Sequence, residues 1–210
     1  MPTGSTANSV CILDYGSGNV KSIYNRFSSL ASNVTVSNSC HEIEKSSHIV
    51  LPGVGSFGNV MSKIKRTLPL DTLEKEVFLH EKPFLAICVG MQVLSEKGHE
   101  FEEHEGLGWI SGEVRILDTV DHPLPHIGWN DIKINRRSSL LAGIDQGSDF
   151  YFVNSYVFTV DDINNVVAST EYGTLFTSVV QKNNIFGVQF HPEKSQRTGQ
   201  RLLGNFLGIG

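Results

Sequence analysis

The first half of the chain alternates short apolar runs with stretches whose apolar residues recur at helical spacing. The apolar runs are too short for helices and end at glycine, proline or polar residues, which is typical of buried strands. Strands that alternate with helices form a largely parallel sheet covered by helices. The predicted strands are residues 10–15, 34–36, 49–51 and 84–87, and the predicted helices are 20–30, 73–81 and one that begins at 91–95.

The second half contains seven further strand-like runs that are joined by short turns. Asn183 and Asn184 separate the last two runs and are a hairpin signal. Consecutive strands joined by tight turns run antiparallel, so this half is expected to add antiparallel strands to the sheet before a closing helix at 199–207. The predicted strands are residues 114–117, 131–134, 150–153, 156–159, 166–170, 176–181 and 185–190.

The length of 210 residues suits one domain. A content of 40% hydrophobic and 19% charged residues allows a sizeable core, and it excludes disorder as the dominant state, which would need low hydrophobicity and high charge. We expect a polar, disordered tail over residues 1–9 and a single α/β domain over 10–210.

Charge and cysteine content exclude several classes of protein. The 17 Lys and Arg residues against 22 Asp and Glu residues give a net charge of −5, whereas nucleic-acid binders usually carry a basic stripe. Cys11, Cys40 and Cys88 are too few for a disulfide scaffold, and their odd number favours reduced thiols in the cytosol. No signal peptide and no apolar run of about 20 residues is present. The sequence predicts a cytoplasmic protein without a membrane or nucleic-acid partner.

Two glycine clusters have part of the spacing of nucleotide-binding loops. Residues 16–18 follow a predicted strand, but Lys21 stands where the dinucleotide fingerprint needs its third glycine. Gly53 and Gly58 have the spacing of a phosphate-binding loop, but Asn59 replaces the lysine that would hold phosphate. We therefore predict no cofactor, and a glycine turn with exposed backbone N–H groups at Gly53.

The eight histidines form no convincing metal motif. His122 and His126 are four residues apart, but the two prolines between them prevent the helix that would aim both at one ion. His99 and His104 lie in a Glu-rich stretch that is expected to be a solvated loop. We predict no metal site.

Residues 86–92 contain a cysteine between an apolar strand and a helix, with a small residue two positions before it and glycine two positions after it. This is the nucleophile-elbow pattern, with Cys88 in place of serine. The position at a helix N-terminus favours the thiolate. A cysteine is otherwise a small buried hydrophobic residue, which is the interpretation we favour for Cys11 and Cys40.

His191, Pro192 and Glu193 follow the last predicted strand, so His191 is expected at the same sheet edge as Cys88. Residues i and i+2 of an extended stretch point the same way, which lets Glu193 orient the imidazole. A cysteine on an elbow, a histidine base and a carboxylate that orients the base form a nucleophilic triad. Together these residues predict a cysteine-dependent enzyme.

With these motifs the chain resembles the class I glutamine amidotransferases, and within them the branch of glutaminase subunits of imidazole glycerol phosphate synthases. The resemblance extends from residue 10 to residue 207. The anthranilate and GMP synthase branches usually have histidine where Met91 stands. Asn154 and Val89 depart from the family, which commonly has His and Leu there. The matching stretches are residues 14–19, 51–57, 88–92, 125–130, 151–153 and 189–195.

The resemblance implies a flavodoxin-like fold with a mixed, mostly parallel central sheet, flanking helices and an antiparallel extension. The elbow rule makes the backbone N–H of Val89 one oxyanion donor, and the resemblance adds that of Val54. Family positions that hold the amino-acid part of glutamine match Gly55, Gln92, Glu100, Ser155 and Tyr156, and those that face a partner match Trp129, Asn130, Tyr151 and Lys194. For Ser155 and Tyr156, the ordinary polarity of residues at a strand end is an equally good explanation.

The implied activity is hydrolysis of L-glutamine to glutamate and ammonia, with transfer of the ammonia to a (β/α)8-barrel cyclase in a heterodimer of histidine biosynthesis. Three alternatives stay open. The acceptor could belong to a sugar-amidating synthase of surface polysaccharides, or the chain could be a catalytically idle interaction subunit. A related cysteine hydrolase that acts on a peptide or aldehyde is the third alternative, although the His-Pro-Glu motif does not fit it.

Overall fold

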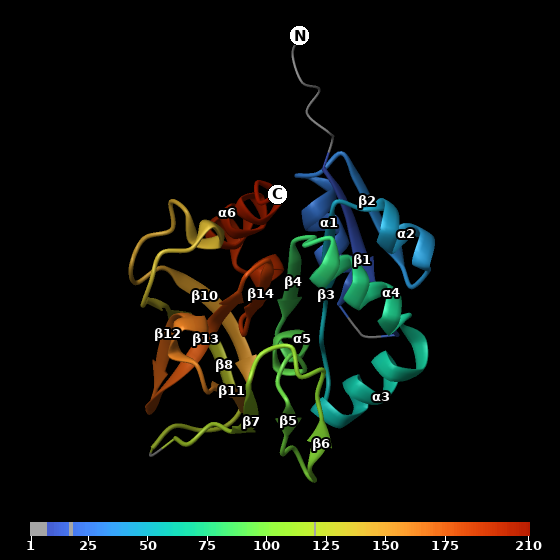
Figure 1. The fold of residues 1–210 in the computed structure, drawn as a ribbon. Coiled ribbons are helices and arrows are strands. Elements are labelled where there is room, and N and C mark those ends of the chain that lie inside the picture. Colours follow the sequence, from blue (N-terminus) through green and yellow to red (C-terminus); the bar gives the residue numbers. More distant parts are fainter. Residues whose placement is uncertain (1–7, 17–18, 120) are drawn as a thin grey trace.

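A mixed central sheet organises the molecule (Figure 1). The computed structural model describes residues 8–16, 19–119 and 121–210, and within them the sheet has eight strands in the order β2-β1-β3-β4-β14-β13-β12-β9. The first five are parallel and the last three join them antiparallel, as predicted. The strands are β1 (Ser9–Leu13), β2 (Asn33–Ser37), β3 (His48–Leu51), β4 (Phe84–Ile87), β9 (Lys133–Ile134), β12 (Val166–Tyr172), β13 (Thr174–Lys182) and β14 (Ile185–Val188).

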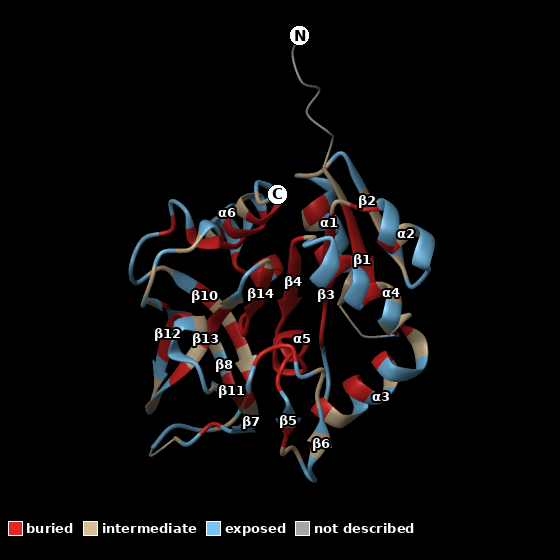
Figure 2. Ribbon diagram, in the orientation of Figure 1, coloured by how far each residue is buried: buried red, intermediate tan, exposed pale blue. Residues whose placement is uncertain are grey.

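The central parallel strands are buried along their whole length, which explains why they are continuous apolar runs. Figure 2 shows buried residues on these strands and exposed residues on the outer sides of the helices. Helices α1 (Val20–Ser28) and α6 (Gln196–Leu207) contact each other through Phe27 and Phe206, whose ring centroids are 6.2 Å apart. Helix α6 starts three residues before the predicted closing helix. None of the helices in the described residues has the length and apolar character needed to cross a membrane.

The second half departs from the prediction in how its strands pair. Three predicted strands are present but lie outside the central sheet, so the expectation that they extend it is wrong. In the described residues, β10 (Asp149–Asn154) pairs with β8 (His126–Asp131), and β11 (Tyr156–Val160) joins β7 (Gly112–Ile116), β5 (Lys97–Gly98) and β6 (His104–Glu105). Alternating side chains identify a strand but not its neighbour, which depends on the path of the chain.

Several elements were not predicted, or have other boundaries. The predicted strand 131–134 is instead β8, which ends at Asp131, followed by the short β9. The stretch predicted as a solvated loop around His99 and His104 contains β5 and β6. The prediction also lacked helices α2 (Cys40–Lys45) and α3 (Phe57–Thr67).

Some predicted elements begin or end at other residues in the structure. Strand β1 begins at Ser9 and ends at Leu13, whereas 10–15 was predicted. Residues 1–7 of the predicted tail and residues 17–18 of the first glycine cluster lie outside the described residues. Asn183 and Asn184 form the two-residue turn between β13 and β14, as predicted, and Asn183 has a φ of 53°.

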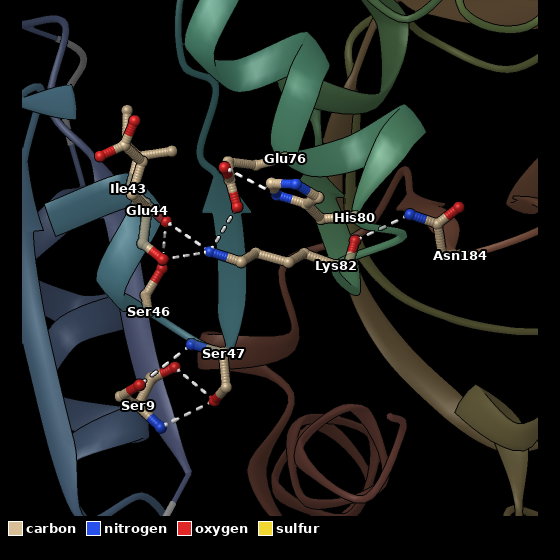
Figure 3. A network of polar contacts seen from close by, with 9 residues as sticks. All are labelled: Ser9, Ile43, Glu44, Ser46, Ser47, Glu76, His80, Lys82 and Asn184. Atoms are coloured by element: carbon tan, nitrogen blue, oxygen red, sulfur yellow. Dashed lines mark hydrogen bonds and ion pairs between the residues drawn. The ribbon is translucent and has the colours of Figure 1, made fainter. Parts of the chain in front are cut away.

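The predicted helix 73–81 is divided into α4 (Leu70–Glu74) and a π-helical turn, η1 (Lys75–Leu79). The side chain of Glu76 in η1 is buried, and its carboxylate is 2.6 Å from Nζ of Lys82 and 2.9 Å from Nδ1 of His80 (Figure 3). Lys82 Nζ also donates to the carbonyl oxygen of Ile43 at 3.1 Å, so the pair joins η1 to α2. A buried carboxylate needs such partners, because desolvation of a lone charge is costly.

Two further sets of polar contacts are drawn with this network (Figure 3), one connected to it through Lys82 and one separate from it. Asn184 donates from Nδ2 to the carbonyl oxygens of Val77 and Lys82, both at 2.8 Å, and so connects the β13–β14 turn to η1. Ser9 and Ser47 exchange backbone and hydroxyl hydrogen bonds of 2.9–3.0 Å beside β1 and β3. These polar contacts all lie at the amino ends of the central strands.

Candidate active site

Cys88 stands directly after β4 and directly before the short helix α5 (Val89–Gln92). Its φ of 56° and ψ of −116° place it in a region that residues with a side chain rarely adopt, at a cost of about 1–3 kcal/mol. The turn is held by hydrogen bonds from Cys88 N to the carbonyl oxygen of Val188 at 2.8 Å and from Met91 N to that of Cys88 at 2.9 Å. The strained turn of the predicted elbow is therefore present.

Close backbone packing explains the glycines of the elbow. A Cβ atom added at Gly90 would lie 2.4 Å from the carbonyl oxygen of Leu51, and one added at Gly53 would lie 2.0 Å from the amide nitrogen of Gly90. Only glycine allows the segment after β3 to pass this close to the elbow. The packing brings the predicted glycine turn at Gly53 beside Cys88.

His191 follows β14, which is the neighbour of β4 in the sheet, so both side chains emerge from adjacent strand ends (Figure 1). Nδ1 of His191 is 2.8 Å from Oε1 of Glu193, and the imidazole is close enough to Cys88 for the two side chains to interact electrostatically. All three residues are at least 95% buried. The structure thus brings the three predicted triad residues into one chain of contacts.

The charge state of His191 follows from these contacts. Burial alone would lower the pKa of His191, but hydrogen bonds and charge interactions with Cys88 and Glu193 outweigh it and raise the pKa to about 10. The ring therefore holds a proton at neutral pH. A protonated imidazole beside the sulfur stabilises a thiolate and provides a proton for a leaving group.

Glu193 has further partners that the sequence did not predict. Oε1 of Glu193 also accepts a hydrogen bond from Nδ2 of Asn19, and its backbone oxygen accepts one from Nε of Arg26 at 3.1 Å. Asn19 has a φ of 70° and immediately precedes α1. Its position in the family-like stretch 14–19 was the signal that could have identified it.

A cavity of about 510 Å³ opens above Cys88 and His191. It is lined by both predicted oxyanion residues, Val54 and Val89, and by every residue predicted to hold glutamine: Gly55, Gln92, Glu100, Ser155 and Tyr156. Its wall includes six residues that were not predicted to bind: Phe101, Ile116, Leu124, Pro125, Val153 and Asn154. A cavity with a nucleophile, a base and several polar groups is a suitable substrate site.

Polar contacts within the wall organise several of these side chains. Nε2 of Gln92 donates to the carbonyl oxygen of Tyr156 at 2.9 Å and to Oε1 of Gln189 at 3.0 Å. Oε2 of Glu100 accepts a hydrogen bond of 2.7 Å from the backbone N–H of Phe57, so Glu100 also caps helix α3. Asn154, where the family commonly has histidine, donates from Nδ2 to the same Tyr156 oxygen at 3.3 Å.

The predicted partner-facing residues lie on and beside the β8–β10 pair. Trp129 and Tyr151 are opposite each other in this pair, with ring centroids 5.9 Å apart, and Nζ of Lys194 lies 5.6 Å from the Tyr151 ring. Asn130 points to the other side of β8 and donates to the carbonyl oxygen of Glu171 at 2.9 Å. The first three residues therefore form one cluster, and Asn130 is separate from it.

Other polar groups give no sign of a metal centre. Among the residues that the structure describes, no three His, Cys, Asp or Glu side chains are grouped so that they could hold a metal ion. His126 is buried and stacks on Tyr172, with ring centroids 4.0 Å apart, while burial and His122 lower its pKa. It is a neutral residue of the core at neutral pH.

Comparison with known proteins connects this geometry to a family. Residues 11–208 match the family described as glutamine amidotransferase class-I. The chain belongs to this family. It is 42% identical over 206 residues to the imidazole glycerol phosphate synthase subunit HisH of Pelagibacter ubique, covering 95% of this chain and 99% of that protein. The subunit HisH of Zymomonas mobilis is 42% identical over 208 residues, with 96% of each chain covered.

Solved structures show the same class I amidotransferase fold at low sequence identity. A putative GMP synthase chain from Thermoplasma acidophilum has a TM-score of 0.72 and 18% identity, covering 98% of this chain and 94% of that one. A chain in the structure of PurLQS from Thermotoga maritima has a TM-score of 0.73 and 15% identity, covering 96% and 98%. These likenesses confirm the predicted fold class.

Proposed function

We propose that this chain is the glutaminase subunit of an imidazole glycerol phosphate synthase. The observation that carries the proposal is the contact chain of Cys88, His191 and Glu193 at the cavity, in a protein 42% identical over nearly its whole length to subunits with that name. The subunit hydrolyses L-glutamine to glutamate and ammonia, and the ammonia serves histidine biosynthesis.

The reaction begins at the sulfur of Cys88, which attacks the side-chain carboxamide carbon of glutamine. His191 takes up the thiol proton before the attack, since its pKa of about 10 keeps the imidazole protonated at neutral pH. It then donates this proton to the departing ammonia. Glu193 orients the ring through the 2.8 Å bond to Nδ1 and stabilises its cationic form. Water then hydrolyses the thioester to glutamate.

The negative oxygen of the tetrahedral intermediate requires hydrogen-bond donors. We assign this role to the backbone N–H groups of Val89, the residue after the nucleophile, and of Val54 in the neighbouring glycine turn. Both residues line the cavity. Gly53 and Gly55 flank Val54, and Gly55 has a φ of 115°, so reorientation of the Val54 peptide is sterically inexpensive. Loss of one such donor typically lowers turnover by about 10²–10³-fold.

The polar residues of the cavity wall hold the amino-acid part of glutamine in this proposal. Gln92 and Glu100 are already fixed by hydrogen bonds to Tyr156 and Phe57, which prepares them for a ligand at little further cost in side-chain entropy. Gly55, Ser155 and Tyr156 also line the cavity, and we assign them the same role.

The ammonia must reach its acceptor without release into water, because free ammonia at neutral pH is mostly protonated and no longer a nucleophile. We propose a heterodimer with a (β/α)8-barrel cyclase, which joins the ammonia to a ribulosyl aminoimidazole carboxamide nucleotide. Trp129, Asn130, Tyr151 and Lys194 are the proposed contact residues. Trp129 is 47% exposed and Tyr151 packs against it, and exposed aromatic residues with a nearby cation are common at interfaces.

The alternatives from the sequence are less well supported. The HisH relatives do not favour a sugar-amidating synthase. The complete contact chain around Cys88 argues against an idle subunit, and the family match argues against a peptide or aldehyde hydrolase. The three free cysteines suit a reducing compartment, so we place the complex in the cytoplasm.

The test measures glutamine hydrolysis with and without the barrel cyclase, for the native chain, Cys88→Ala and Cys40→Ala. Hydrolysis should rise when the cyclase is present, and Cys88→Ala should lose it by several orders of magnitude, as nucleophiles of such catalytic units do. Cys40 is exposed, so the expectation that it is buried is wrong, and it lies outside the cavity. Cys40→Ala should therefore keep native turnover. Native turnover by Cys88→Ala would refute the assignment of the nucleophile.

A further inference from the structure

Gln189 is a buried polar residue without a role in the proposed reaction. It directly follows β14, whose four residues are apolar or glycine, and none of its surface is exposed. A buried carboxamide without partners costs about 1–3 kcal/mol, so a residue of this kind at this place is expected to have specific contacts. Because Val188 accepts the backbone N–H of Cys88, Gln189 lies immediately beside the nucleophile.

Hydrogen-bond chemistry determines which end of the Gln189 amide faces the sulfur. The carbonyl oxygen of Tyr156 can only accept, so the atom of Gln92 that contacts it at 2.9 Å is the donor Nε2. The same Nε2 lies 3.0 Å from Gln189, whose contacting atom is therefore the acceptor Oε1. This leaves Nε2 of Gln189 toward Cys88, with 3.8 Å between the nitrogen and Sγ.

We propose that Gln189 is a positioning residue that donates a hydrogen bond from Nε2 to Sγ of Cys88, and so holds the sulfur and stabilises its anionic form. The inference rests on the proposed role of Cys88 as nucleophile. A donated hydrogen bond favours the thiolate over the thiol, because the thiolate is the stronger acceptor. It also opposes the alternative contact in which Sγ donates to the carbonyl oxygen of Val153, 3.9 Å away.

The position of Gln189 separates this role from substrate binding. Val54, Gln92 and Tyr156 line the cavity, but Gln189 is not among the described residues of its wall. It reaches the sulfur from the interior, on the side of the sheet. Loss of its N–H should therefore change the reactivity of Cys88 and the turnover number, and should leave the affinity for glutamine nearly unchanged.

The test uses the full-length chain, with Cys40 replaced by serine because that thiol is exposed. The rate of Cys88 alkylation by iodoacetamide is followed by mass spectrometry from pH 5 to 10, without glutamine or cyclase. Gln189→Met keeps the length of the side chain and removes the donor to the sulfur. It also removes the acceptor for Gln92, but Gln92 keeps its 2.9 Å bond to the carbonyl oxygen of Tyr156 and so stays in place. It should react about tenfold more slowly at pH 7, equivalent to about 1.4 kcal/mol, with its rate profile moved to higher pH.

Gln181→Met provides the matched control, since Gln181 lies on β13 and donates to Asn183 at the far hairpin. Gln189→Glu retains the acceptor for Gln92 but places a carboxylate near the sulfur, so it should slow alkylation more than Gln189→Met does. If Gln189→Met does not fold, the alkylation rate of Gln189→Glu tests the proposal instead. In the cyclase complex, kcat of Gln189→Met should fall about tenfold while KM for glutamine stays within about twofold.

Two outcomes would overturn the proposal. One is native alkylation rates and a native pH profile in both Gln189 variants, and the other is a loss of turnover that appears wholly in KM. Because alkylation requires neither glutamine nor the partner, its result is independent of whether the chain is a glutaminase.

Discussion

The contact between Glu193 and His191 allows the contribution of the orienting carboxylate to be estimated. Glu193→Gln preserves size and leaves an oxygen that can accept from Nδ1 of His191, now 2.8 Å away, but it removes the negative charge. Exchange of a charged for a neutral acceptor costs about 1–1.5 kcal/mol. The Coulomb attraction between a carboxylate and an imidazolium about 4 Å apart adds about 4 kcal/mol at an effective dielectric constant of about 20.

These two effects overlap, so we expect the imidazolium and the transition state that contains it to lose about 3–5 kcal/mol of stabilisation, which corresponds to about 10²–10⁴-fold in kcat. Burial of the new NH₂ group at the place of Oε2, which has no hydrogen-bond partner in the described structure, adds a further cost to folding. The pKa of His191 should fall from about 10, because one of the groups that raises it is lost.

The assay is steady-state glutamine hydrolysis in the presence of the cyclase, with thermal unfolding as a check of the fold and NMR titration of His191. A suitable control is Glu113→Gln, because Glu113 accepts a 2.7 Å bond from Nε2 of His99 outside the cavity. The control should retain native turnover. Native turnover in Glu193→Gln, or an unchanged pKa of His191, would refute the orienting role of the carboxylate.

Three further changes test other parts of the structure. Lys82→Met leaves the buried Glu76 carboxylate without its cation and should lower the free energy of unfolding in urea by about 3–5 kcal/mol at pH 7. Burial alone would raise the pKa of Glu76, but hydrogen bonds from Lys82 and His80 lower it below 4.5. The pair therefore stabilises the fold above pH 4.5, and this contribution is lost as the pH falls through the lowered pKa of Glu76. An equal loss of stability in the variant at pH 7 and at pH 3 would contradict this. Gly90→Ala should displace the elbow and abolish most turnover. The control Gly204→Ala should stay active, because a Cβ atom at this position on α6 meets open space. An active Gly90→Ala would show that the close packing is dispensable. Trp129→Ala should weaken binding of the cyclase by at least about 2 kcal/mol in calorimetry, and unchanged affinity would place the interface elsewhere.

The candidate site was predictable from the sequence to the extent that it depends on local geometry. The elbow around Cys88 is defined by small residues at fixed positions, and the 2.8 Å contact between His191 and Glu193 connects residues only two positions apart. Cys88 and His191 could be placed at one sheet edge because both follow apolar strands. The contacts of Asn19 and Gln189 could not be predicted, because they connect segments more than 100 residues apart.

The fold divides in the same way. Apolar runs and turn residues determined which segments are strands, and they determined that the first half forms a parallel sheet, because these properties depend on a few neighbouring residues. Tertiary structure alone decided that β8 and β10 pair outside the central sheet, that Glu76 and Lys82 meet beside a π-helical turn, and that Gln189 faces the sulfur. The physical reason is that local patterns restrict the conformation of each segment, whereas partners between distant segments depend on the packing of the whole chain.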